Sequence, residues 1–434
     1  MNELQLGALI FVVTLLLLFT GIPVAFGLVI VAVGFLVAVE GWGSIATVGV
    51  NFYEQIASFA LLTIPLFIFF GSAIGSSRAA ADIYEVLNRW LIRVPGGLVI
   101  ANIMACGSFS ALCGSSPATA AAVGKVGVPE MRKRGIPAAL ATGAVAAGGT
   151  LGILIPPSIT LIVYGIATEQ SIGRLFLAGV GPGILIVLLF SLYVFVASWL
   201  NRQNADIPLP RYSLRERMEG VPRILPFLLI ILFVLYALYG GLATPSEIAA
   251  VVAASSFLLV LFIYGRTSPR AWLGTLKETV RESTMILFII AAAGLFSYMM
   301  SMLYVTQSVA EWIIATDMNR WVLFGFLNVL MLIAGCFLPP VAIILMVMPI
   351  IQPILMLNDF DMIWFGIVMT INLEIALITP PVGLNLYVLR GVSPDIPLKT
   401  ILAGSVPFVL LMLLSIVILC FLPGIALWLP NALM

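Results

Sequence analysis

Apolar runs long enough to cross a lipid bilayer recur along almost the whole of this 434-residue chain. A bilayer core of about 30 Å needs about 20 apolar residues in a helix, which satisfies its own backbone hydrogen bonds there. The composition agrees, because 62% of the residues are hydrophobic and only 9% are charged, against about 25% charged in soluble domains. We therefore predict an all-α polytopic membrane protein.

The composition also limits the chemistry. The sequence has no histidine, which excludes histidine-based catalytic triads, proton relays and metal sites. A net charge of +1 gives no electrostatic reason to bind nucleic acid. The four cysteines fall in apolar stretches and are expected to pack as small hydrophobic residues. Most catalytic functions are thereby excluded, and no organic cofactor is expected.

About ten stretches qualify as full crossings. We place them near 4–20, 22–39, 58–76, 138–167, 175–200, 222–241, 245–264, 283–304, 363–391 and 400–429. With this count most basic residues fall on one side of the bilayer, in 78–93, 132–134, 202–223 and 266–281, with Lys399. Because Lys and Arg are retained in cytoplasmic loops, that side is cytoplasmic and both termini are expected outside.

Two further apolar stretches do not fit as crossings. Residues 96–128 have basic flanks at both ends, and the Gly-Ser-Ser-Pro midpoint at 114–117 disfavours a continuous helix. Residues 321–357 have acidic flanks and are divided at Pro339 and Pro340. We predict that these are two re-entrant helical hairpins, which enter the membrane from opposite faces.

A sequence repeat supports the same arrangement. The Pro-Pro pair at 156–157 recurs at 380–381, about 225 residues later, and a Leu-Ala-Gly motif at 177–179 recurs at 402–404. Each half would then contain a hairpin, a helix interrupted at Pro-Pro and a further helix. Inverted repeats of this kind are typical of secondary transporters, whose interrupted helices meet at a site near the middle of the membrane.

The hairpin tips and helix breaks carry the candidate ligands. Carbonyl groups and helix ends that lack helical partners can bind an ion there. Hydroxyl, amide and glycine residues cluster at these places: Ser115, Ser116, Thr119, Gly148, Gly149, Thr150, Gly152, Ser158, Thr160, Asn372, Thr379, Gly383 and Asn385. This set is rich in neutral oxygen and poor in charge, which favours Na⁺ over a tightly held divalent ion. Small residues of these types also serve close helix packing.

Two acidic residues fall inside predicted crossings. Glu247 follows Thr244-Pro-Ser and is expected to cap the start of a helix. Glu374 lies near the middle of its span, where it could bind a proton or an ion or pair with a basic residue. Outside the crossings, residues 78–94 have the spacing of an interfacial amphipathic helix, and residues 269–282 are a candidate for a second one.

These motifs resemble one family. Gly114-Ser-Ser-Pro-Ala-Thr119, Gly148 to Ser158, Thr244 to Glu247 and Thr379 to Asn385 are similar to segments of the large membrane subunit of tripartite ATP-independent periplasmic (TRAP) transporters, the DctM type. The resemblance implies an elevator-type secondary transporter of the bacterial or archaeal inner membrane, with a transport domain that carries both hairpins and moves against a scaffold. It also implies Na⁺-driven uptake of an organic acid, a periplasmic substrate-binding protein, and a small four-helix membrane subunit, expected as a separate chain.

The resemblance also implies roles for single residues. It assigns one Na⁺ site to Ser115, Gly149, Gly152 and Pro156 and another to Thr379 and Gly383, and substrate contacts to Ser116, Thr119, Ser158 and Asn385, to which we add Thr160 of the first break. This chain departs from the family at the second hairpin tip, where Pro339 and Pro340 stand in place of a usual Asp. Lys125 and Arg390 are the basic residues nearest to the breaks.

The expected organisation is scaffold helices in 1–76, an interfacial helix in 77–95, a first repeat in 96–200, a loop and scaffold helices in 201–304, and a second repeat in 305–434. One alternative is an autonomous Na⁺-coupled carboxylate symporter that needs no binding protein. An intramembrane aspartyl protease would need paired Asp residues within crossings, and the predicted crossings contain none. A channel would not explain two opposed hairpins.

Overall fold

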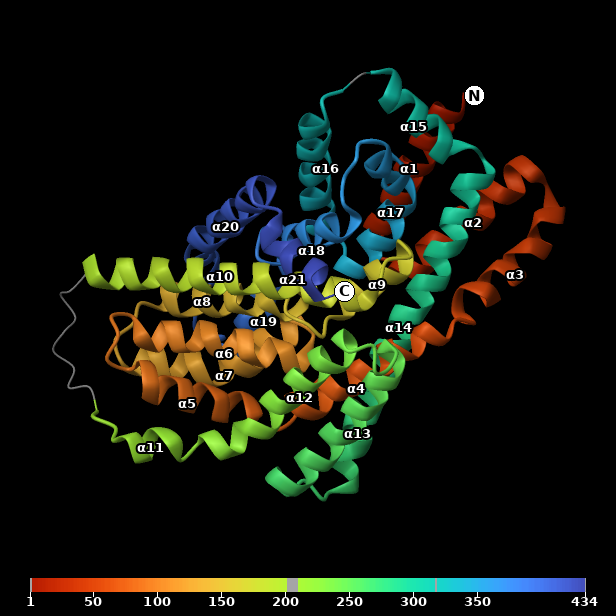
Figure 1. Ribbon diagram of the computed structural model, residues 1–434. Coiled ribbons are helices and arrows are strands. Elements are labelled where there is room, and N and C mark those ends of the chain that lie inside the picture. The colour runs from red at the N-terminus through yellow and green to blue at the C-terminus, as the bar shows by residue number, and fades with distance from the viewer. Residues whose placement is uncertain (1, 201–209, 317, 434) are drawn as a thin grey trace.

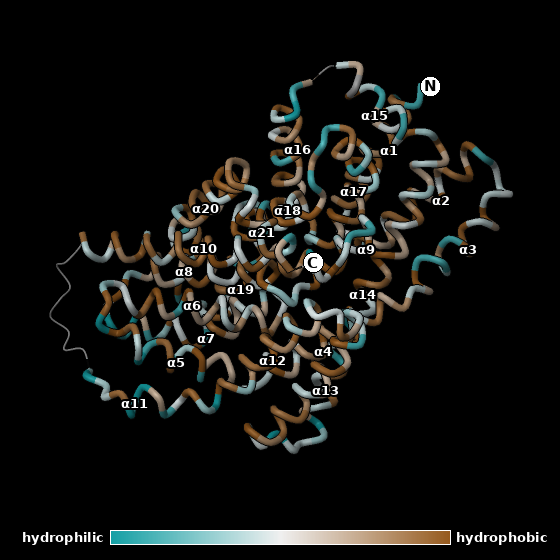
Figure 2. The backbone as a smooth tube through the Cα atoms, viewed as in Figure 1, coloured by the Kyte–Doolittle hydropathy of each residue, from teal (hydrophilic) through white to brown (hydrophobic). Residues whose placement is uncertain are grey.

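The computed structural model describes residues 2–200, 210–316 and 318–433, and every regular element among them is a helix (Figure 1). Residues 201–209, which belong to the predicted basic loop, lie outside the described residues. Brown apolar segments fill most of the molecule in Figure 2, whereas teal polar segments gather at helix ends and at α11 (Leu214–Met218). This pattern follows from the need of each apolar run to satisfy its backbone internally.

The first group of elements precedes the first hairpin. It consists of α1 (Glu3–Phe19), α2 (Val24–Glu40), η1 (Trp42–Ser44), α3 (Ile45–Ile56), η2 (Phe59–Leu62) and α4 (Thr63–Gly75). The sequence did not predict α3, an amphipathic helix with no buried residue. It joins α4 at a bend of 57°, so the expected crossing at 58–76 is one part of a bent pair.

The first half contains the predicted hairpin and the broken helix. Its elements are α5 (Ala79–Leu91), α6 (Gly97–Cys113), α7 (Ser116–Lys133), α8 (Ala138–Gly149), η3 (Thr150–Ile153), α9 (Ile159–Ala167) and α10 (Ile172–Leu200). Figure 1 shows α5, α6, α7, α8 and α10 stacked side by side, in agreement with their contacts. The predicted helix at 78–94 is therefore present as α5, which packs on the hairpin.

The middle of the chain contains α11, α12 (Val221–Tyr239), α13 (Pro245–Tyr264) and α14 (Pro269–Met302). The predicted cap of α13 is present, since Thr244 and Glu247 form a capping box. The separate interfacial helix considered at 269–282 is wrong. Those residues are continuous with 283–302 in the 34-residue α14, because the segment contains no proline after Pro269 that would interrupt it.

The second half contains α15 (Val305–Ala315), α16 (Arg320–Gly335), α17 (Pro340–Leu357), α18 (Met362–Leu377), α19 (Leu384–Val392), α20 (Leu398–Phe421) and α21 (Gly424–Leu433). The single crossing expected at 400–429 is wrong in its extent. The helix ends before Leu422 and Pro423, and α21 continues separately and packs against α10.

The number of crossings stays a prediction. Six helices of the described chain are long and apolar enough to span a membrane by length and composition, or up to seven if the bent pair forms one span. They include α17, which we expected as one arm of a re-entrant hairpin. The shorter apolar helices include α1, α2, α6, α16 and α18. Ten crossings would require α1 and α2 to span singly, and α8 with α9 and α18 with α19 to span as pairs across the breaks.

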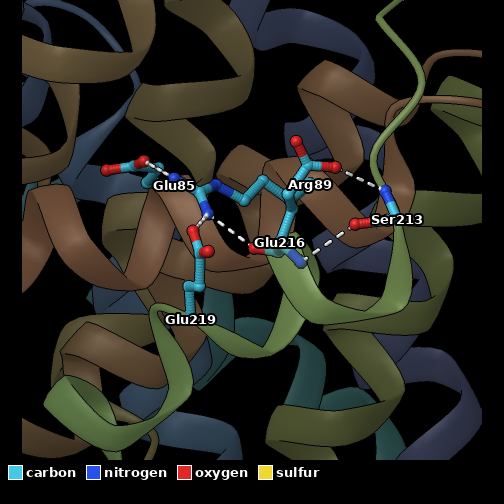
Figure 3. A network of polar contacts seen from close by, with 5 residues as sticks. All are labelled: Glu85, Arg89, Ser213, Glu216 and Glu219. Atoms are coloured by element: carbon cyan, nitrogen blue, oxygen red, sulfur yellow. Dashed lines mark hydrogen bonds and ion pairs between the residues drawn. The ribbon is translucent and has the colours of Figure 1, made fainter.

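A polar network attaches the middle of the chain to the first half (Figure 3). Arg89 of α5 pairs with Glu85, donates to the backbone carbonyl of Glu216 at 2.5 Å and lies 3.6 Å from the carboxylate of Glu219. Ser213 caps α11 and lowers the pKa of Glu216 by hydrogen bonding. The network thereby fixes α11 alongside α5.

Helix α8 of the first half and α20 of the second lie so close together that no side chain fits between their backbones at Gly143 and Gly404. A Cβ on Gly404 of α20 would lie 1.8 Å from the carbonyl oxygen of Ala139 in α8, and a Cβ on Gly143 would lie 2.1 Å from that of Gly404. Gly404 is the second glycine of the repeated Leu-Ala-Gly motif. In the first copy, a Cβ on Gly179 of α10 would lie 2.5 Å from the carbonyl oxygen of Leu154.

Candidate functional site

The tip of the first hairpin fits against the first helix break. Gly114 follows α6 in the left-handed region at φ 63°, which favours glycine, and Ser115, the residue before α7, is extended. A Cβ on Gly152 would lie 2.6 Å from the carbonyl oxygen of Ser115, so only glycine allows this approach. The carbonyl oxygen of Pro157 faces Gly114. The structure thus brings together the hairpin tip and the segment that contains Pro156.

This junction suits the first ion site that the family resemblance implies. Gly149 also lies against the tip, since its Cβ would come within 3.2 Å of the carbonyl oxygen of Ser116. The available donors at Ser115, Gly149, Gly152 and Pro156 are uncharged oxygens beside backbone that has left the helix. Neutral oxygens at a helix break are the kind of donor that a monovalent cation takes, and the assignment of an ion to them stays a prediction.

The second pair, Thr379 and Gly383, lies together in the second break. Gly383 begins α19 in the left-handed region at φ 56°, and its Cβ would come within 3.1 Å of the carbonyl oxygen of Thr379. The hydroxyl of Thr379 donates to the carbonyl of Ile375 at 2.6 Å, which leaves its own carbonyl as the candidate ligand. A cis peptide joins the prolines of each Pro-Pro pair.

Ser116 and Asn385, two of the predicted substrate contacts, bond to each other, and Ser116 also bonds to Glu374 of the opposite half. The Ser116 hydroxyl donates to the Glu374 carboxylate at 2.9 Å, and the side-chain amide of Asn385 donates to the Ser116 hydroxyl at 2.8 Å. The same amide reaches the carbonyl oxygen of Ala146 in α8 at 3.4 Å. All three side chains are 0% exposed. Hairpin tip, broken helices and both halves therefore converge at this point.

The other predicted substrate contacts do not join this network. Ser158 caps α9: its hydroxyl donates to the carbonyl of Ile153 and accepts from the backbone N–H of Leu161 at 3.2 Å. Thr160 is buried in the first turn of α9. Thr119 is buried in α7, and its hydroxyl has no hydrogen-bond partner within the described chain. The Ser158 hydroxyl is thus used to cap α9.

The sequence left the partner of Glu374 open, and the structure supplies Ser116. The described residues contain four ion pairs, and Glu374 takes part in none of them. Asn372, two residues earlier, donates to the backbone and side chain of Asn328 in α16, at 2.7 and 2.9 Å. Sequence reasoning missed Asn328, although its signal was visible as the one polar side chain inside the apolar run of α16.

A cavity of about 250 Å³ lies beside the hairpin tip, between α4, α7 and the first part of α14. Its lining combines small side chains with three charged ones: Ile68, Gly71, Ser72, Gly75, Ser76, Cys113, Ser115, Ala118, Ala121, Ala122, Lys125, Ile159, Glu278 and Glu282. Lys125, a predicted candidate cation, is exposed and lines this cavity. Arg390 is exposed and donates to the carbonyl of Ile396.

Comparison with known proteins places this geometry in a family. Residues 11–425 match the model described as "Tripartite ATP-independent periplasmic transporter, DctM component". The chain is 38% identical over 388 residues to the C4-dicarboxylate TRAP transporter large permease protein DctM of Pseudomonas aeruginosa, covering 89% of this chain and 90% of that one. It is 29% identical over 420 residues to the sialic acid TRAP transporter large permease protein SiaM of Vibrio cholerae, covering 96% of both.

The fold has a solved counterpart. The crystal structure of the Alcanivorax borkumensis YdaH transporter matches with a TM-score of 0.64 and 18% sequence identity, over 91% of each chain. At that identity the match concerns the fold alone. It agrees with an all-helical polytopic architecture that contains several apolar spans and a bent helix pair.

Proposed function

The chain belongs to the DctM family of tripartite ATP-independent periplasmic transporters, and from this premise we propose that it drives Na⁺-coupled uptake of an organic acid. It is the large permease component of such a system and a multi-pass membrane protein, not an enzyme. The solute is a small carboxylate such as a dicarboxylate or a sugar acid. This proposal extends to the chain what the names of its relatives say of them.

One observation carries the transport proposal. The Ser116, Glu374 and Asn385 side chains join the tip of one hairpin to the broken helix of the other half, in a fully buried position. A site built from interrupted helices of two halves is the arrangement that secondary transporters use for solute and ion. The cavity beside Ser115 supports the proposal, because it offers space for a small solute next to the same tip.

The mechanism we propose is an elevator. The hairpins, the broken helices, α10 and α20 form the moving transport domain, because α8 and α20 are locked together by backbone contact at Gly143 and Gly404. Helices α1 to α4 and α12 to α14 form the scaffold. Both termini lie on the periplasmic side in this proposal, as the distribution of basic residues predicts.

Na⁺ supplies the driving force in this proposal. Two ions are held, one by Ser115, Gly149, Gly152 and Pro156 and one by Thr379 and Gly383, whose backbone oxygens lie at the two breaks. Each ion, when bound, stabilises the packed hairpin tip or break around it. Na⁺ binding and solute binding then favour the same arrangement, which couples the two gradients.

Two partners complete the proposed system. A soluble periplasmic binding protein delivers the organic acid, and a small four-helix membrane subunit stands beside this chain. The exposed apolar residues of α3, such as Tyr53 at 70% exposed, and of its neighbour η2, such as Phe59 at 68%, are compatible with lipid or with such a subunit.

The test is uptake of radiolabelled dicarboxylate or sialic acid by proteoliposomes that contain the chain and the small subunit, with and without an inward Na⁺ gradient and the binding protein. We expect saturable uptake only when Na⁺ and the binding protein are both present. Uptake with Na⁺ alone would instead identify an autonomous symporter. Non-saturable flux that ignores the Na⁺ gradient would contradict the transporter proposal altogether.

A further inference from the structure

The cavity beside the hairpin tip is lined by charges of both signs. Lys125 of α7 contributes one positive charge, and Glu278 and Glu282 of α14 contribute two negative charges. The two glutamates are four residues apart, so their side chains lie on the same face of α14. Most of the other lining residues are small, which leaves the charged groups in contact with the space of about 250 Å³. A cavity of this kind can orient a small ligand by its charges.

The three charged side chains of the cavity are not paired with one another. The structure shows four ion pairs among the described residues, and none of them includes a charge of this cavity. Lys277 and Arg281, the basic residues next to the glutamates in α14, do not line the cavity. Arg266 reaches its wall by donating to Ser76, but its guanidinium is stacked over the Trp272 ring, 5.2 Å from the centroid. The lysine and the two carboxylates can therefore bind a ligand.

These three groups specify the chemistry of the ligand. The ammonium group of a lysine only donates hydrogen bonds, and ionised carboxylates only accept them. The lysine therefore requires a negative group on the ligand, whereas the glutamates require a positive donor. A simple carboxylate would satisfy Lys125 and leave both glutamates without a partner, and its own negative charge would add to theirs. An acid that also carries an ammonium group satisfies all three side chains.

We propose that the cavity binds an organic acid that also carries an ammonium group, with the carboxylate at Lys125 and the ammonium group at Glu278 and Glu282. The inference rests on the proposed function and narrows its solute to amino-bearing organic acids. Lys125 belongs to the proposed transport domain and the two glutamates to the proposed scaffold, so the bound solute connects the two. The carboxylates of α14 repel simple acids and thereby select for the amine.

Binding to the purified chain with its small subunit tests this inference. Thermal unfolding is followed in NaCl at neutral pH and constant ionic strength while an acid is added, and the rise in melting temperature gives the affinity for that acid. The acids are used in pairs that differ in the amine: alanine and propionate, aspartate and succinate, glutamate and glutarate, and 2-amino-2-deoxygluconate and gluconate. We expect the amino member of at least one pair to bind at least about tenfold more tightly than its counterpart.

Variants assign the preference to the cavity. The double variant Glu278→Gln/Glu282→Gln should lose the preference for the amine, because only the amino member of a pair loses its partners. Lys125→Gln should weaken the binding of both members alike, since both carry the carboxylate. Glu54→Gln in α3 and Lys277→Gln in α14 are the matched controls outside the cavity, and both should bind as the wild type does. Glu282→Gln alone serves if the double variant does not fold, and it should reduce the preference in the same direction.

The outcomes separate this inference from the proposed function. If simple acids bind and no amino member binds more tightly than its counterpart, the inference is overturned while transport of an organic acid stands. A preference for the amine that persists in the double variant would overturn the assignment to Glu278 and Glu282. Equal losses in Lys125→Gln and Lys277→Gln would overturn the role of Lys125. Absence of binding by every acid of both kinds would overturn the inference and the proposed function together.

Discussion

Ser116 and Glu374 stand 258 positions apart in the chain and share a buried hydrogen bond of 2.9 Å. One residue begins the second arm of the first hairpin, and the other lies near the end of the first segment of the second broken helix. Neither half of the chain contains all three residues of this centre, which we define as Ser116, Glu374 and Asn385. Its geometry therefore depends on how the halves cross, which is the property that mutations can test.

Ser116→Ala should impair transport strongly. The change removes the hydroxyl that donates to Glu374 and accepts from Asn385, and it strands both buried partners. Stranding such groups costs about 1–3 kcal/mol, so uptake in proteoliposomes should fall by about tenfold to a hundredfold. Ser110→Ala is the control, since the Ser110 hydroxyl is buried without a partner in the described chain, and its uptake should stay within about twofold of the wild type. An equal loss in both variants would argue against a special role for Ser116.

Gly404→Ala should destabilise the crossing of the two halves. Its Cβ would lie 1.8 Å from the carbonyl oxygen of Ala139, so α20 and α8 must separate, at a cost of about 1–3 kcal/mol or more. We expect a melting temperature several degrees below that of the wild type in detergent. Gly325→Ala in α16 is the control, because nothing lies within 4 Å of the added Cβ and alanine favours helix. Equal melting temperatures for Gly404→Ala and the wild type would show that α20 and α8 can move apart at Gly404 without loss of stability, which would contradict this prediction.

The opposed hairpins can be tested by labelling from each side. Lys133 at the base of the first hairpin and Asp359 at the base of the second are both exposed. In a Cys420→Ala background, where the remaining cysteines are buried, Lys133→Cys should react with a membrane-impermeant maleimide from the cytoplasmic side and Asp359→Cys from the periplasmic side. Reaction of both from the same side would overturn the inverted repeat.

The pair Arg132–Asp395 predicts a modest dependence of stability on pH. Arg132, at the end of the first hairpin, donates to Asp395 in the loop before α20 and holds the pKa of that carboxyl below its ordinary value. A lowered pKa means that the contribution is complete above the unfolded pKa of about 3.9 and is lost as the pH falls through the folded value. The difference in melting temperature between wild type and Asp395→Asn should thus be constant at neutral pH and disappear in acid.

The same pair should respond to salt. Both side chains are about half exposed, so solvent and ions screen their interaction. We expect the difference between wild type and Asp395→Asn to be small and to shrink further as the NaCl concentration rises. A difference that persists unchanged below pH 3 or in molar salt would indicate that Asp395 acts through something other than its charge.

The positions of many helix ends could be predicted from the sequence, because each end depends on a few neighbouring residues. The Gly-Ser-Ser-Pro tip separates α6 from α7 near the expected residues, and Thr244 and Glu247 cap α13 as expected. Helix α3 was not predicted. Thr47, Asn51, Glu54 and Gln55 interrupt its apolar residues, so it lacks the continuous apolar run by which the other membrane helices were recognised.

The centre could be predicted only in part. Its candidate residues were identified at the tips and breaks, where unpaired backbone is easy to locate in a sequence. The bonds from Ser116 to Glu374 and Asn385 could not be predicted, since they depend on the angle and depth at which the halves pack. Ser158 shows the opposite case, because its hydroxyl is used locally to cap α9 and a sequence cannot distinguish that use from ligand contact.

The interlocked halves also set an order of events in biosynthesis. Ser116 leaves the ribosome long before Glu374 and Asn385 are made, and at ordinary rates of synthesis the interval is on the order of tens of seconds. During that time α6 and α7 are complete, and Ser116 at the start of α7 lacks both of its side-chain partners. A message cut short before Glu374 therefore yields a chain that contains most of the helices and lacks the hydrogen bonds among Ser116, Glu374 and Asn385.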